Sequence, residues 1–176
     1  VILVLGLAPS ETAREIVRKP WVAGRFVYAN QIIGRDVPAL EVKSELPVLS
    51  KNGFLASHPF IPENLRKPES KWERLEAGRL ISIAACSSCH SLTDTGIRPI
   101  AKYFPAEADA AGIKDWLSAG LYRGHIVYMP PLPLPELDRS VMSEFLAEII
   151  SVQKTDPQRA ANYAVKGFPK DSVGGK

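Results

Sequence analysis

The stretch Lys71–His90 reads KWERLEAGRLISIAACSSCH, and it decides the fold because a helical repeat of apolar residues leads directly into a cysteine pair. Its apolar residues at roughly helical spacing are Trp72, Leu75, Leu80, Ile83 and Ala84. This spacing predicts a helix over residues 71–86. The predicted helix therefore ends inside the pattern Cys86-Ser87-Ser88-Cys89-His90.

The cysteine pattern indicates a covalently attached cofactor. The chain has 2 cysteines, Cys86 and Cys89, which are too near each other to close a useful disulfide loop. Cys-x-x-Cys-His is the attachment pattern of c-type haem, whose vinyl groups bond to the two thiols while the histidine becomes an iron ligand. A redox Cys-x-x-Cys would accompany a βαβ pattern, and a zinc site would need two more ligands, where only His58 and His125 remain. We therefore predict one covalent haem c, held by Cys86, Cys89 and His90.

The sixth iron ligand is predicted from a short set of candidates. Methionine and histidine are the usual choices, and Met129 lies in a rigid, proline-flanked segment, Tyr128-Met129-Pro130-Pro131. His125 is the alternative. Met142 lies inside an apolar helix pattern and is expected in the core, whereas His58 is expected to be exposed or bonded to the backbone. The predicted metal ligands are therefore His90 and Met129, with His125 left open in place of Met129.

These features resemble the class I cytochrome c family over about residues 70–155. Gly78 lies in the helix before the motif, and Met129-Pro130-Pro131 looks like the family's axial-methionine loop. Phe145-Leu146 resembles the C-terminal helix that crosses the helix before the motif. Pro99 follows the motif by nine residues, and the resemblance implies that a proline carbonyl near this place accepts a hydrogen bond from the axial histidine. It thus implies an all-α, class I cytochrome c-like domain in which Pro99 supports the cofactor site.

Two further helices are predicted after the motif. One covers about residues 107–121, and the other, over 136–152, has the clearest apolar stripe in the chain. The stripe consists of Leu137, Val141, Phe145, Leu146, Ile149 and Ile150. We assign residues 71–155 to a monohaem cytochrome domain, 22–70 to a long, proline-rich, extended docking arm and 156–176 to a poorly packed polar tail.

Residues 1–21 are predicted to hold the end of a transmembrane helix and a juxtamembrane segment. The first eight residues, VILVLGLA, form an apolar run without alternation. Eight helical residues span about 12 Å of a bilayer core about 30 Å thick, so the run would be only the remnant of such a helix. A buried N-terminal strand is the alternative.

Residues 10–21 also resemble a short segment of the large subunit of cytochrome bd quinol oxidases. That segment reads Glu-x-x-Arg-Gln-Pro-Trp, and this chain has Lys19 in place of the glutamine. The matching residues are Glu15, Arg18, Pro20 and Trp21. The resemblance implies that Glu15 faces a haem in a neighbouring scaffold.

The sequence predicts electron transfer rather than catalysis by this chain. A net charge of +3 without a basic stripe of interleaved aromatic residues argues against nucleic acid as a partner. Haem c is attached outside the cytoplasm, so we expect a membrane-anchored or complex-associated chain on the periplasmic side of a bacterial inner membrane. The expected partners are other membrane subunits of a respiratory complex and a redox partner protein or cofactor. The alternative is a haem enzyme, or a cytochrome that binds small ligands through a displaceable sixth position, with Arg123 and His125 as distal groups.

Overall fold

The described part of this computed structural model is helical. It comprises residues 26–28, 30–96, 98–104, 108–118 and 132–173, with Gly6, Pro9 and Ser10. Its helical elements are η1 (Pro38–Leu40), α2 (Leu46–Ser57), η2 (Glu63–Leu65), α3 (Lys71–Cys86), η3 (Ile100–Tyr103), α4 (Ala110–Ser118), α5 (Glu136–Thr155), α6 (Pro157–Lys166) and α7 (Lys170–Val173). Apart from two isolated β-bridges, these residues contain no β-structure. The predicted all-α class is therefore confirmed for this part of the chain.

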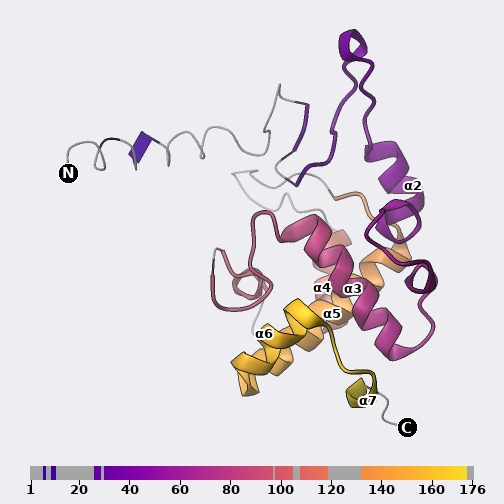
Figure 1. The fold of residues 1–176 in the computed structure, drawn as a ribbon. Coiled ribbons are helices and arrows are strands. Elements are labelled where there is room, and N and C mark those ends of the chain that lie inside the picture. The colour runs from indigo at the N-terminus through magenta and orange to yellow at the C-terminus, as the bar shows by residue number, and fades with distance from the viewer. Residues whose placement is uncertain are drawn as a thin grey trace.

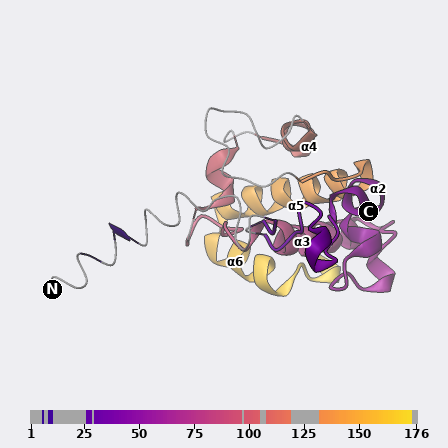
Figure 2. The same cartoon turned by 90° about the horizontal axis from the view of Figure 1, so that it is seen from above.

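The core forms where α3 packs against α5 (Figure 1). A Cβ built on Gly78 of α3 would lie 2.0 Å from the carbonyl oxygen of Val141 and 2.8 Å from Cβ of Phe145, both on α5. Only glycine allows the two helices to approach this closely. α5 also packs against α4 and α6, and it lies between them when the molecule is seen from above (Figure 2).

The start of α3 is fixed by a local signal. The side chain of Ser70 accepts a hydrogen bond from Glu73 N at 3.2 Å, and the Glu73 carboxylate accepts one from Ser70 N at 2.9 Å. This reciprocal capping box satisfies amides that have no partner within the helix. The observed bounds, Lys71–Cys86, confirm the predicted helix.

The apolar stripe of α5 faces the core as predicted, with one exception. Val141, Phe145, Leu146 and Ile149 are fully buried and Ile150 nearly so, whereas Leu137 is 41% exposed. α5 extends three residues beyond the predicted end, to Thr155. α4 starts at Ala110, three residues after the predicted start at 107, and is described as far as Ser118. The predicted end, at residues 119–121, lies outside the described residues.

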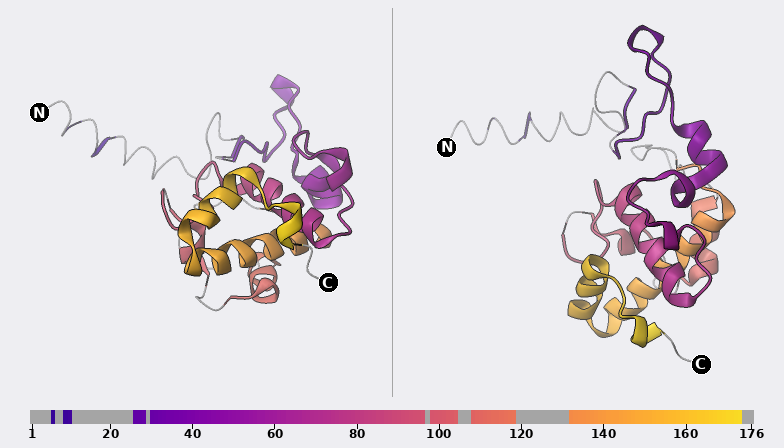
Figure 3. Two further views of the ribbon diagram at one scale, coloured as in Figure 1. Left: turned by 60° about the horizontal axis from the view of Figure 1, so that its bottom comes forward. Right: turned by 45° about the vertical axis from the view of Figure 1, so that its right-hand side comes forward.

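The prediction that residues 22–70 form an extended arm is wrong for α2. Pro47 lies in the first turn of this helix, where a missing amide hydrogen costs nothing. Gly53 then breaks the helix with φ 72°, and the amides of Phe54 and Leu55 donate to the carboxylate of Asp138 at 2.5 and 3.3 Å. Because Asp138 lies in the first turn of α5, α2 is fixed to the body of the molecule (Figure 3).

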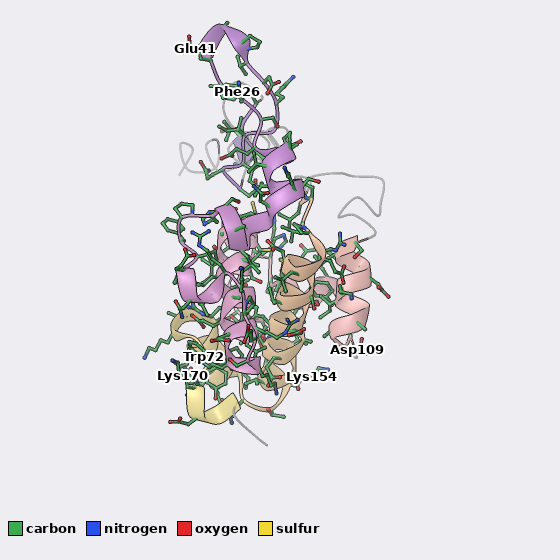
Figure 4. All side chains as sticks on the ribbon, turned by 90° about the vertical axis from the view of Figure 1, so that its right-hand side faces the viewer. Phe26, Glu41, Trp72, Asp109, Lys154 and Lys170 are labelled. Atoms are coloured by element: carbon green, nitrogen blue, oxygen red, sulfur yellow. The ribbon has the colours of Figure 1, made fainter. Side chains whose placement is uncertain are left out.

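Apolar side chains join the same arm to the core. Leu49, Phe54, Leu55, Ile61 and Leu65 are all buried in the cluster that contains the α3 and α5 residues. Residues 26–28 and 30–45 include a projection with bridges at Val27–Ile33 and Val37–Val42, and Glu41 lies near its tip (Figure 4). Tyr28 and Ile32 of the same stretch also belong to the buried cluster.

The prediction of a poorly packed tail after residue 155 is also wrong. Arg79 of α3 pairs with Glu76, and its Nη1 donates to the carbonyl oxygen of Val165 at 3.1 Å, near the end of α6. Beyond α6, the carbonyl oxygen of Phe168 accepts a hydrogen bond from the Trp72 indole at 2.7 Å. Lys170 lies 4.5 Å from the centre of the Trp72 ring, and both side chains are labelled in Figure 4. The tail therefore closes one side of α3.

Among the described residues, no helix combines the length and apolar character that crossing a bilayer requires. Most of residues 1–21, including the predicted transmembrane remnant and Glu15, lie outside the described residues.

Candidate functional site

The predicted attachment motif lies on the turn that ends α3. Cys86 is the last residue of the helix, and its carbonyl oxygen accepts hydrogen bonds from the amides of Cys89 at 3.0 Å and His90 at 2.9 Å. The chain thus turns tightly between Cys86 and His90. The turn is anchored to a helix whose position is fixed by its packing on α5, so the motif stands on a rigid base.

The two cysteines form no disulfide and lie in different surroundings. Cys86 is 8% exposed, whereas Cys89 is half-buried. Burial, with a smaller effect of the neighbouring Cys89, raises the pKa of the Cys86 thiol to about 12. A thiolate is the reactive form of cysteine, so burial lowers the reactivity of the Cys86 thiol.

His90 is buried, with 8% of its surface exposed. Its Nδ1 lies 2.8 Å from the carbonyl oxygen of Arg98. A histidine that donates through Nδ1 to a carbonyl presents Nε2 to a metal, and the hydrogen bond fixes the plane of the ring. His90 is therefore prepared to act as an axial ligand.

The predicted role of the Pro99 carbonyl needs correction. Arg98, one residue earlier, has a left-handed backbone with φ 46°, and its carbonyl is the one that reaches His90. The Pro99 carbonyl instead accepts a hydrogen bond from Lys102 N at 3.1 Å, which begins η3. Pro99 is itself buried, so its part in the site is to hold the turn that follows Arg98.

Tyr103, at the end of η3, was missed by the sequence interpretation. Its ring packs edge to face with that of His90, with centroids 5.2 Å apart and an angle of 86° between the planes. No sequence pattern links His90 to Tyr103. Their contact depends on the path of the loop after His90, which brings η3 back beside the motif. A backbone hydrogen bond from Ile100 N to the carbonyl oxygen of Ser91, at 2.9 Å, makes that return.

The donor set fits a covalently attached haem. Two thiols lie on the turn with the spacing that two vinyl groups need, and the imidazole beside them is oriented through Nδ1. Among the described residues, the motif included, no group of three or more histidine, cysteine, aspartate or glutamate side chains is arranged to hold a bare metal ion. The chemistry of these side chains therefore agrees with the predicted cofactor.

The candidates for the sixth ligand divide into described and undescribed residues. Met129 and its alternative, His125, lie outside the described residues, so both stay predictions. Met142 is 1% exposed within the core, as expected. His58 accepts a hydrogen bond from Phe60 N at 3.3 Å, and burial lowers its pKa, which confirms the expected backbone bond.

A pocket of about 510 Å³ lies apart from the motif. Asp109 at the start of α4 and Lys154 at the end of α5 mark two of its sides (Figure 4). Its other lining residues are Lys71, Leu75, Ala108, Ala110, Glu144, Ala147, Glu148, Ile150 and Ser151. None of these residues belongs to the Cys86–His90 turn. The pocket is therefore separate from the candidate haem site.

Comparison with known proteins relates part of the chain to an oxidase subunit. Two curated proteins from Helicobacter pylori, one of them from strain 52, match the chain, and both are named cbb3-type cytochrome c oxidase subunit CcoP. Each is 32% identical over 104 residues, covering 53% of this chain and 35% of the relative. The chain thus spans about a third of the length of the curated relatives it matches. No protein-family model matches the chain, and no solved structure gives a significant match.

This similarity supports the prediction of a c-type cytochrome segment related to respiratory oxidase subunits. It does not support the resemblance of residues 10–21 to a cytochrome bd subunit, because the relatives are named as subunits of a different oxidase.

Proposed function

We propose that this chain is a c-type cytochrome that carries electrons within a respiratory oxidase complex. One haem c is bonded through Cys86 and Cys89, and His90 and Met129 are its axial ligands. The observation that carries the proposal is the turn after α3, where both thiols stand beside a histidine whose Nδ1 is 2.8 Å from the Arg98 carbonyl oxygen. The similarity to an oxidase subunit gives the proposal its respiratory context.

In this proposal, the residues of the site hold the haem and orient its axial ligand, and none of them takes part in a chemical reaction with a substrate. Cys86 and Cys89 anchor the cofactor to the end of α3, and α3 is anchored by the close packing at Gly78. The Arg98 carbonyl keeps His90 in the tautomer that binds metal through Nε2. The bound haem supplies a one-electron couple, and a thioether ligand such as Met129 raises its potential.

The proposal includes a class I cytochrome c fold for this chain. Its support is the crossing of α3 and α5 at Gly78 and Phe145, which are two of the residues on which the family resemblance rests. The expected setting is the periplasmic side of a bacterial inner membrane, with other subunits of the complex as partners. The projection at residues 26–45 is available to such partners, because Leu40 near its tip is 61% exposed.

The proposed function is tested by a redox titration of the haem-loaded protein, followed by addition of carbon monoxide to the reduced form. An electron carrier with Met129 bound gives a reversible one-electron couple and a spectrum that carbon monoxide does not change. A spectrum that shifts with carbon monoxide would contradict pure electron transfer and favour the alternative of a small-ligand-binding cytochrome. Met129→Ala is the positive control, because it opens the sixth position.

A further inference from the structure

The ring of Tyr103 covers the imidazole of His90. The two rings meet edge to face at 5.2 Å, and His90 is 8% exposed while Tyr103 is 48% exposed. The edge-to-face contact with Tyr103 is therefore one of the contacts that bury the His90 ring.

The backbone on both sides of Tyr103 is fixed. Pro99 is buried, and its carbonyl oxygen accepts a hydrogen bond from Lys102 N at 3.1 Å, which closes the η3 turn. Phe104 is 7% exposed and packs edge to face on Trp116 of α4, with centroids 5.0 Å apart. The position of Tyr103 is thus imposed by buried neighbours rather than by its own exposed side chain.

The same short segment contacts His90 in two ways. The Arg98 carbonyl receives the Nδ1 hydrogen bond at 2.8 Å, and Tyr103, five residues later, packs against the ring. Rotation of the imidazole about its bond to Cβ would break the hydrogen bond to Arg98 and would drive the ring against Tyr103. Tyr103 packs on the ring whose Nδ1 makes this hydrogen bond, and a hydrogen bond is stronger where water is excluded.

We infer that Tyr103 is a positioning residue that fixes the plane of the axial histidine and shields its hydrogen bond to Arg98, an inference that rests on the proposed function. Its aromatic ring carries this role, and its hydroxyl does not. Nothing in the family resemblance assigns a role to this position. The reduction potential of the haem depends on hydrogen bonding and solvent exposure around the axial ligand, so it reports on the shielding.

The test compares Tyr103→Phe and Tyr103→Leu in the haem-loaded protein. Attachment is checked first by mass, so that a failure to bind haem, which would contradict the proposed function, is separated from a failure of this inference. Tyr103→Phe keeps the ring and should leave the midpoint potential unchanged. Tyr103→Leu removes the ring and should shift the midpoint potential, because both the solvent exposure and the hydrogen bond of the axial histidine change. We expect a shift of the ferric-to-ferrous ratio approaching tenfold, equivalent to about 59 mV for one electron.

A second readout measures the hydrogen bond directly. Hydrogen exchange of the His90 Nδ1–H in the reduced protein, followed by NMR, should be faster in Tyr103→Leu than in Tyr103→Phe. Phe60→Leu is the matched control, because Phe60 is a 75% exposed ring that packs on His58, with centroids 5.2 Å apart, and not on His90. Equal potentials and equal exchange rates in all three variants would overturn the inference. So would equal shifts in Tyr103→Phe and Tyr103→Leu, because only the second variant lacks the ring.

Discussion

Burial distinguishes the two thiols of the attachment turn, and chemical labelling detects the difference. The pKa of the Cys86 thiol is raised to about 12 by burial, whereas Cys89 is half-buried. In protein prepared without haem, iodoacetamide at pH 8 should therefore modify Cys89 well before Cys86, as measured by peptide mass. In urea the two rates should converge. Equal rates in the native protein would show that the end of α3 is open.

Gly78 sets the distance between α3 and α5. Gly78→Ala places a Cβ 2.0 Å from the Val141 carbonyl oxygen, so the helices must separate, at a cost of roughly 1–3 kcal/mol or more. The measurement is denaturant unfolding of the haem-loaded variant. Gly112→Ala in α4 is the control, because the nearest atom to its Cβ is an Asp109 carboxylate oxygen at 3.3 Å and alanine favours helix by about 1 kcal/mol. Equal stability of the two variants would contradict the close crossing.

Asp138 makes the stability depend on pH. Its pKa is raised above the ordinary value of 3.8 by burial, although the amides of Phe54 and Leu55 partly oppose the shift. Because the pKa of Asp138 is higher in the folded state than in the unfolded state, the folded protein binds this proton more tightly than the unfolded chain does. The contribution of Asp138 is therefore complete below pH 3.8 and is lost as the pH rises through the folded-state pKa.

Asp138→Asn isolates this effect, because an amide oxygen can still accept from Phe54 N and does not titrate. The free energy of unfolding of the wild type should fall relative to that of Asp138→Asn as the pH is raised from below 3.8 into the neutral range. Parallel pH profiles for the two proteins would show that the carboxyl group titrates alike in the folded and unfolded states.

At the scale of elements, the helices with local signals were predicted well. Residues 71–86 have both an apolar repeat and a capping box at Ser70 and Glu73, so their helix could be read directly. α6 also has such signals, with Asp156 accepting from Arg159 N at 2.9 Å, Pro157 in the first turn and Gly167 after the end, but its polar composition was interpreted as a tail. α2 was missed because Pro47 and the prolines that flank the helix suggest coil. Its stabilising contact, from Phe54 N to Asp138, also joins residues 84 positions apart.

The closure of α6 on α3 depends on a buried ion pair. The side chains of Arg79 and Glu76 are 10% and 12% exposed, and Arg79 also donates to the Val165 carbonyl oxygen. Arg79→Met leaves Glu76 buried without its partner and should cost about 3–5 kcal/mol in denaturant unfolding. Lys114→Met, in a solvent-exposed pair with Glu136, should cost much less, because water screens the two charges. Similar losses in both variants would mean that the pair at Arg79 is solvated.

At the scale of the whole molecule, the arm and the tail are parts of one body rather than appendages of a cytochrome domain. Ile61 and Leu65 from the arm and Phe168 from the tail lie in the same buried cluster as Phe145 of α5. The Cys86–His90 motif could be located from the sequence because its pattern is local, but the carbonyl partner of His90 was misplaced by one residue. That detail depends on the left-handed backbone at Arg98, which no residue preference signals.

The central claim is that one haem is bonded to Cys86 and Cys89, and intact mass under denaturing conditions tests it most directly. The measurement uses protein matured in a host that attaches haem c, with Cys86→Ser/Cys89→Ser as the control. We predict that the wild type has the mass of the chain plus one haem after denaturation, and that the double variant has the mass of the bare chain. A wild-type protein with the bare mass, from a host that loads a reference cytochrome, would contradict the account.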